Sequence, residues 1–186
     1  KSAARVRLDR KGMVTVETDM TDIGTGSYTI IAQTAAEMMG VDMDKVNVYL
    51  GDSRFPESSG SGGHWGAASS TAGVYAACVT LREAVATQLG LDPTKTEFID
   101  GHVREGSKNL PLAQATENGD LVAEDVMEFG DLAKQYAQQT FGAHFVEVGV
   151  NAATGEIRLR RQLAVCAAGR ILNPKTARSQ IIGGMT

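Results

Sequence analysis

Two glycine loops, each rich in hydroxyl side chains and each followed by a helical pattern, constrain this chain more than any other feature. The first reads Asp-Ile-Gly-Thr-Gly-Ser-Tyr-Thr over residues 22–29, and the second is the Gly- and Ser-rich stretch 58–71. Glycine leaves main-chain N–H groups accessible because no Cβ shields them, and a helix N-terminus adds partial positive charge. Two such loops in one small domain predict an extended anionic ligand that is held from two sides.

Composition limits the classes of partner. The chain has 186 residues and a net charge of −4, so it offers no broad basic surface to nucleic acid or to an anionic membrane. No apolar run reaches the roughly 18 to 20 residues that a membrane span needs. We therefore expect a soluble protein without nucleic-acid or membrane partners, whose compartment, cytoplasmic or periplasmic, stays open. Cys78 and Cys166 lack a metal-type spacing, and we expect both to be buried thiols.

Hydrophobic periodicity predicts an α+β fold in the first half of the chain. Alternation over 5–8 and 14–17 indicates a β-hairpin, and helical spacing from Tyr28 to Met39 ends at Gly40, a typical C-terminal stop. A short strand at 46–50 and a long loop at 51–68 follow. Ser69, Ser70 or Thr71 is expected to cap the next helix.

The sequence pattern of the second half predicts a small insert followed by further strands. A strand at 97–103, a polar connection and a helix at 128–138 read as a small α/β insert, followed by strands at 143–150 and 157–164 and a helix from Thr176. The fold expected is a mixed β-sheet with packed helices plus this insert. The division expected is 1–91 for the part with both loops, 92–140 for the insert and 141–186 for the returning strands. Both ends fall within patterned segments, and we expect the sequence to be part of a longer polypeptide.

Several motifs occur in a specific order along the chain. They include Asp-Ile-Gly-Thr-Gly-Ser-Tyr-Thr at 22–29, Gly-Ser-Gly-Gly-His-Trp-Gly-Ala at 60–67, Arg-Ile-Leu-Asn-Pro at 170–174 and Gln-Ile-Ile-Gly-Gly at 180–184. This order resembles the molybdenum-binding large subunit of the xanthine dehydrogenase and aldehyde oxidase family, and within it the bacterial aldehyde oxidoreductases. The resemblance implies an incomplete molybdopterin-binding domain of the xanthine oxidase type.

The resemblance also implies a cofactor, its binding residues and its partners. The cofactor is molybdopterin, carried in bacterial members as the cytosine dinucleotide, and the reaction oxidises aldehydes to carboxylic acids or hydroxylates electron-poor heterocycles. Electrons then pass to partner subunits that carry [2Fe-2S] clusters and FAD. The family's catalytic glutamate lies beyond this sequence, in the rest of the large subunit, so this chain alone is expected to be inactive. The positions that match cofactor contacts are Ile23, Gly24, Thr25, Gly26, Gly62, Gly63, His64, Trp65, Gly66 and Gln180.

Two other functions remain open from the loops alone. The first is a non-catalytic anion-binding or assembly module that uses the same loops. The second is a phosphate-handling enzyme, which the absence of a Lys beside either loop disfavours. Trp65 likewise has two interpretations, either lining the site or packing under the loop as an anchor.

Overall fold

Alternation of apolar and polar side chains produces an antiparallel hairpin at the start of the chain, as expected. Strand β1 (Ser2–Leu8) pairs with β2 (Val14–Thr18), and Val6 lies opposite Val16. The side chains of Ala4, Val6 and Leu8 are fully buried on one face of the hairpin. On the other face Arg5 forms ion pairs with Glu17 and Glu124, at 3.1 and 2.9 Å. One face of the hairpin is therefore apolar and covered, and the other carries charged side chains.

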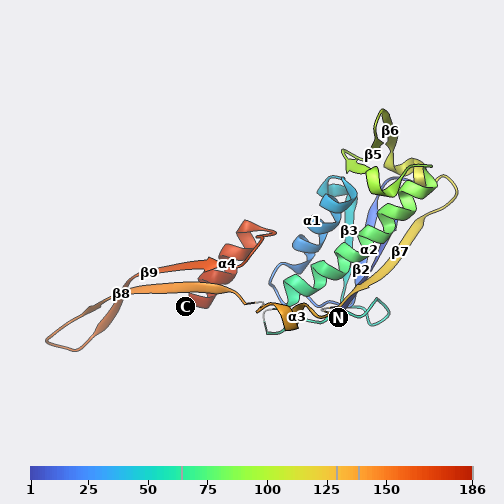
Figure 1. The fold of residues 1–186 in the computed structure, drawn as a ribbon. Coiled ribbons are helices and arrows are strands. Elements are labelled where there is room, and N and C mark those ends of the chain that lie inside the picture. Colours follow the sequence, from blue (N-terminus) through green and yellow to red (C-terminus); the bar gives the residue numbers. More distant parts are fainter. Residues whose placement is uncertain (64, 129, 138, 186) are drawn as a thin grey trace. The chain divides into compact units, whose positions relative to one another are not determined.

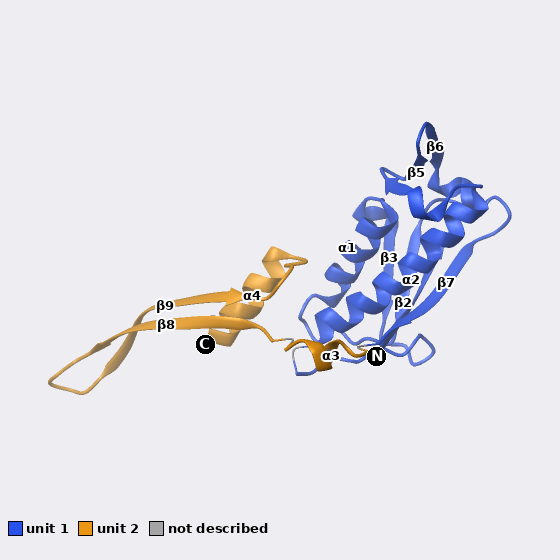
Figure 2. Ribbon diagram, in the orientation of Figure 1, with its two compact units in different colours: residues 1–129 blue, residues 130–186 orange. Residues whose placement is uncertain are grey.

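This computed structural model describes residues 1–63, 65–128, 130–137 and 139–185. They form two compact units, residues 1–129 and residues 130–186, which Figure 2 shows in different colours. The three-part division at residues 91 and 140 stays a prediction.

The first unit contains a mixed four-stranded sheet, which confirms the expected fold class. Its strand order is β3-β2-β1-β7, where β3 (Val46–Leu50) runs parallel to β2 and β7 (Leu121–Met127) runs antiparallel to β1. Helix α1 (Ser27–Met39) connects the parallel pair, because parallel strands require a crossover. Helix α2 (Gly66–Gln88) packs beside α1 against the same sheet (Figure 1).

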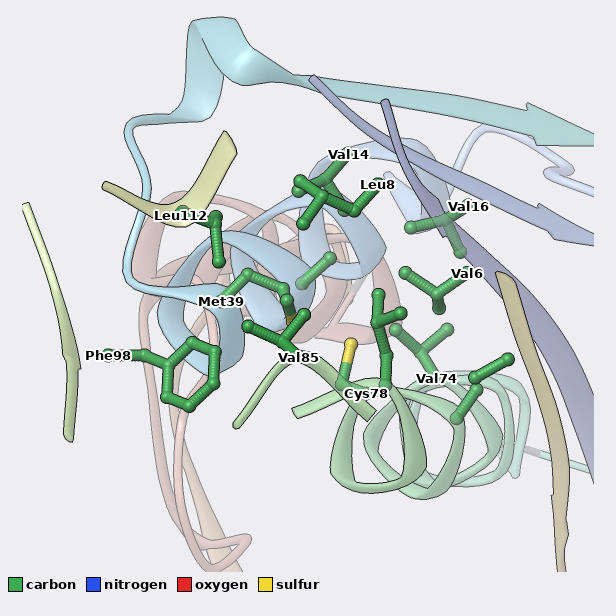
Figure 3. Close-up of a cluster of buried hydrophobic side chains, with 14 of the residues drawn as sticks. Val6, Leu8, Val14, Val16, Met39, Val74, Cys78, Val85, Phe98 and Leu112 are labelled. Carbon is green, nitrogen blue, oxygen red and sulfur yellow. The ribbon is translucent and has the colours of Figure 1, made fainter. Parts of the chain in front are cut away.

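The core of the first unit lies between these helices and the sheet (Figure 3). It combines valine and leucine side chains from the strands with apolar side chains from both helices and from the segments beyond them. Burial of each such side chain stabilises the fold by about 1.5–3 kcal/mol. The labelled members are Val6, Leu8, Val14, Val16, Met39, Val74, Cys78, Val85, Phe98 and Leu112. Burial raises the pKa of the Cys78 thiol to about 12, so this cysteine behaves as an apolar side chain.

Three expectations about element boundaries were wrong. Helix α2 begins at Gly66, and the hydroxyls of Ser70 and Thr71 donate back to the carbonyls of Gly66 and Ala67 within the helix rather than capping it. The segment 97–103 is not one strand. It splits into β4 (Glu97–Ile99) and β5 (His102–Glu105) at an Asp-Gly turn with positive φ at both residues.

The third error concerns the expected helix at 128–138, of which the structure contains a single turn, α3 (Leu132–Gln135). The polar connection before it ends in strand β7, which pairs with β1 along its whole length, from Ser2 opposite Met127 to Leu8 opposite Leu121. Only Ala123 of β7 is buried, so this edge strand carries almost no apolar periodicity in its sequence. Phe129 and Gln138 lie outside the described residues.

Short elements complete the first unit. Strand β6 (Lys108–Pro111) joins β4 and β5 in a second sheet of order β4-β5-β6. Three 3₁₀ turns lie at Met43–Lys45, Pro93–Lys95 and Leu112–Thr116. No helix among the described residues is both long enough and apolar enough to cross a membrane.

The second unit is a long antiparallel hairpin with one helix. Strand β8 (Phe141–Val150) pairs with β9 (Ile157–Ala167), and helix α4 (Pro174–Met185) packs against β9. None of the residues described in this unit is buried, and Phe141 and Ile157 are 78% and 69% exposed. The expected burial of Cys166 was therefore wrong, because both faces of this hairpin are exposed.

Gly40 provides a test of how the helices are held against the second sheet. It ends α1 at φ +64°, and its carbonyl accepts a hydrogen bond from the N–H of Gly101 at 2.7 Å. A Cβ at Gly40 would overlap the backbone of Phe98 and Ile99. Gly90, which follows α2 at φ +66°, has no atom within 4 Å of the same position.

We predict that Gly40→Ala lowers the free energy of unfolding by about 2–4 kcal/mol, as left-handed strain and overpacking add. Gly90→Ala should cost only the strain, about 1–2 kcal/mol. Urea unfolding followed by circular dichroism measures both. Equal losses would contradict the close approach at Gly40.

Candidate functional site

The two glycine loops leave the sheet at neighbouring positions. Parallel strands β2 and β3 end side by side, with Thr18 opposite Leu50. The first loop, residues 19–26, leads from β2 into α1, and the second loop, residues 51–65, leads from β3 into α2. The crevice beyond the carboxyl ends of parallel strands is where α/β sheets bind ligands. Both helices begin at this end of the first unit (Figure 1).

Hydrogen bonds join the two loops directly. The N–H of Asp19 donates to the carbonyl of Pro56 at 3.0 Å, and the hydroxyl of Ser61 donates to the carbonyl of Thr21 at 2.8 Å. The carboxylate of Asp19 accepts a hydrogen bond from the N–H of Ser58. The two loops, far apart in the sequence, therefore lie next to each other as one structure.

The first loop is organised around a carboxylate of its own. Oδ1 of Asp22 accepts hydrogen bonds from the N–H groups of Gly24 and Thr25 at 2.7 and 3.1 Å, and Oδ2 accepts one from the N–H of Tyr28 at 3.3 Å. In this structure the N–H groups of Gly24 and Thr25 therefore donate to Asp22, and their expected contact with an external anion stays a prediction. Gly24 has φ +93° and faces open space, and Ile23 beside it is 66% exposed.

The environment of Asp22 favours its charged form. Partial burial raises the pKa of Asp22, but the main-chain N–H groups that point at the carboxylate outweigh this effect and hold the pKa below its ordinary value of 3.8. These N–H groups belong to Gly24, Tyr28, Gly26 and Thr25. The carboxylate therefore stays ionised at neutral pH at the N-terminus of α1, where negative charge is favourable.

The second loop is covered by the indole ring of Trp65. Its Nε1–H donates to the carbonyl of Ser59 at 3.3 Å, and a Cβ placed on Gly62 would lie 3.3 Å from the ring. A Cβ on Gly63, which has φ +46°, would overlap the ring. The side chain of Trp65 is nevertheless half-exposed. The ring therefore packs on the loop, and the interpretation that it lines a site stays a prediction. His64 lies outside the described residues.

Sequence reasoning missed Ser59 in the same loop. Its hydroxyl oxygen is buried and has no hydrogen-bond partner within the part of the chain that the structure describes. A buried unpaired hydroxyl costs about 1–3 kcal/mol. One Ser among many gave no signal in the sequence. The signal for Asp22 was present, because an Asp two residues before a glycine at a helix start is a typical local capping pattern.

Gln180 belongs to a different unit from the loops. It is an exposed residue of α4 in the second unit, whereas both loops belong to the first. Its expected cofactor contact stays a prediction. A groove of about 580 Å³ occurs at the opposite end of α1 from the loops, between Gly40, Phe98 and Leu112. Among the described residues, no three His, Cys, Asp or Glu side chains form a group that could hold a metal ion.

Comparison with known proteins decides the family. The model of a family described as the molybdopterin cofactor-binding domain matches residues 1–186. The chain belongs to this family. It is 64% identical over all 186 residues to the aldehyde oxidoreductase molybdenum-binding subunit PaoC of Escherichia coli K12, and covers 25% of that protein. It is 30% identical to the probable hypoxanthine oxidase XdhD of the same strain, with 96% of this chain and 20% of that protein covered.

Solved structures agree with this assignment. Quinoline 2-oxidoreductase from Pseudomonas putida 86 matches with a TM-score of 0.81 and 25% identity over 98% of this chain and 25% of its own. CO dehydrogenase from Oligotropha carboxidovorans shares the fold, with a TM-score of 0.82 and 21% identity over 99% of this chain and 24% of its own. This chain therefore spans about a quarter of the length of these relatives.

The contact between Trp65 and Gly63 can be tested because Trp65 is the single Trp of this chain. We predict that Gly63→Ala displaces the indole ring and shifts its fluorescence emission to longer wavelength, since the ring becomes more exposed to water. Both Gly63→Ala and Gly60→Ala carry left-handed strain of about 1–2 kcal/mol. Gly60 has φ +70° and open space around it, so Gly60→Ala is the matched control.

Gly60→Ala should leave the emission maximum where it is in the unmodified chain. An unchanged emission maximum in Gly63→Ala would show that the ring does not lie on the loop.

Proposed function

We propose that this sequence forms part of the large subunit of a molybdenum-dependent oxidoreductase that converts aldehydes to carboxylic acids. The observation that carries the proposal is the 64% identity, over the whole chain, to a subunit named for aldehyde oxidation. Because the chain spans a quarter of that relative, the activity belongs to the complete subunit. The exposed apolar side chains of β8 and β9 support this, since an isolated two-stranded hairpin is at best marginally stable in water.

The cofactor proposed is molybdopterin in its cytosine dinucleotide form, held by both loops. The proposed contacts from the first loop are Ile23, Gly24, Thr25 and Gly26, those from the second loop are Gly62, Gly63, His64, Trp65 and Gly66, and Gln180 adds one from α4. Three features of the first unit fit a bound group there. The loops are joined side by side, Gly24 and Gly60 face open space, and the buried Ser59 hydroxyl needs a partner.

The cofactor and the residues of this chain have different roles in this arrangement. When bound, the cofactor supplies the metal centre at which the substrate carbon is oxidised and from which electrons leave. The residues of this chain bind and orient it through the loops and shield it with the indole of Trp65. We assign the catalytic glutamate to the rest of the large subunit and the electron acceptors to partner subunits with [2Fe-2S] clusters and FAD. This chain alone is therefore inactive.

The proposal predicts stoichiometric molybdenum and pterin in the complete polypeptide that carries this sequence, together with aldehyde-dependent reduction of a dye. Metal analysis, pterin fluorescence after oxidation and the dye assay measure the three quantities on a matured preparation. Absence of both molybdenum and pterin would contradict the proposal and favour a non-catalytic anion-binding module.

A matched pair of serine variants sharpens this test. Ser59→Ala removes the unpaired hydroxyl, so we expect unchanged or higher stability with cofactor retention lowered about threefold, because one hydrogen bond is lost. Ser53→Ala removes an exposed hydroxyl from the same long connection and should change neither quantity.

A further inference from the structure

The first glycine loop holds its shape through a carboxylate that the proposed function does not use. Asp22 accepts hydrogen bonds from three main-chain N–H groups across the start of α1, those of Gly24, Thr25 and Tyr28. None of the positions matched to cofactor contacts carries an ionised side chain within this loop. The carboxylate accepts from two N–H groups of the stretch 23–26, on which the proposed cofactor contacts are placed.

Hydrogen bonds to an ionised acceptor are stronger than neutral ones, and they fix the direction of the N–H groups that donate. Gly24 and Gly26 both have positive φ, at +93° and +88°, so this backbone path is one of many open to a glycine-rich segment. Without an internal acceptor, the loop would lose conformational entropy only when the ligand binds, and the affinity would fall accordingly. The three hydrogen bonds to Asp22 hold the loop in one backbone conformation before the ligand binds.

Resting on the proposed function, we propose that Asp22 is a positioning residue of the cofactor site. It forms the first loop before the cofactor arrives and does not touch the cofactor itself. Asp19, three residues earlier, ties the same segment to the second loop through the N–H of Ser58. The stretch 19–22 therefore sets the shape of one loop and its distance from the other.

An alternative arrangement predicts the opposite effect of removing the Asp22 charge on retention of the cofactor. If the amides of this loop bound a phosphate group of the cofactor, the Asp22 carboxylate would compete with that phosphate and repel it. Removal of its charge would then strengthen retention of the cofactor. A positioning role predicts that removal of the charge weakens retention.

The hairpin turn at the other end of β1 and β2 provides a matched control. Oδ1 of Asp9 accepts hydrogen bonds from the N–H groups of Lys11 and Met13 at 2.8 and 2.9 Å. Asp9 thus holds a turn by the same type of bond, at the end of the strand pair away from both glycine loops. Asp9→Asn and Asp22→Asn remove the same charge from the same kind of turn.

The experiment compares both variants in the complete polypeptide that carries this sequence. We expect Asp22→Asn to retain about tenfold less molybdenum and pterin per folded molecule after dialysis, as the loss of charge-assisted hydrogen bonds implies. The visible circular dichroism of the cofactor that remains should also change. Asp9→Asn should retain the cofactor with an unchanged spectrum, whatever its loss of stability. Equal retention in the two variants, or higher retention in Asp22→Asn, would overturn the inference.

Amide hydrogen exchange on the unmodified, cofactor-free polypeptide tests the same inference without a variant. The N–H groups of Gly24 and Thr25 should be protected before any cofactor is added, and exchange at the rate of unstructured amides would overturn the inference. The proposed function fails separately, if the unmodified polypeptide contains no molybdopterin in any preparation.

Discussion

The hydrogen bonds between residues 19–21 and 56–61 are the interaction on which the candidate site depends. Three of them, through Asp19, Thr21 and Ser61, join a loop that follows β2 to a loop that follows β3. The parallel pairing of these two strands brings the loops to the same edge of the sheet, and the hydrogen bonds then fix them to each other. The two glycine loops consequently act as one surface, although 40 positions separate Thr21 from Ser61.

A side chain of the protein itself contacts each loop, and this changes which loop atoms can contact a ligand. A carboxylate accepts from the amides of the first loop, and an indole ring covers the glycines of the second. The glycines permit unusual backbone paths and close contacts with the protein's own side chains, in addition to approach by a ligand. Gly63 illustrates this, because its missing side chain makes room for Trp65. Gly24 differs, since a Cβ placed on it would meet no atom of another part of the chain within 4 Å.

Much of the fold was predictable because strong periodicity and burial coincide in the first unit. The hairpin of β1 and β2, helix α1 with its stop at Gly40, and strand β3 follow alternation or helical spacing in the sequence. Strand β7 was missed because it is an edge strand with a single buried residue, and its pairing with β1 is decided by a contact over more than a hundred positions. The start of α2 was misplaced because Ser70 and Thr71 satisfy carbonyls within the helix.

Motif order predicts where the candidate site lies, but not its internal chemistry. The residues at 23–26 and 62–66 stand out as glycine loops in the sequence, and their contact with a cofactor stays a prediction. The hydrogen-bond partners of Asp22 and the unpaired hydroxyl of Ser59 depend on side-chain geometry, which cannot be predicted from composition and spacing. Gln180 lies in a unit whose described residues bury no core of their own, and its expected cofactor contact stays a prediction.

A crystal structure of the complete, cofactor-loaded polypeptide that carries this sequence would show whether the two glycine loops bind one ligand. We expect residues 23–26 and residues 62–66 to contact the same cofactor molecule, with the hydrogen bonds of Asp19 and Ser61 between the loops retained. A cofactor that contacts only one of these two segments, or neither of them, would contradict it.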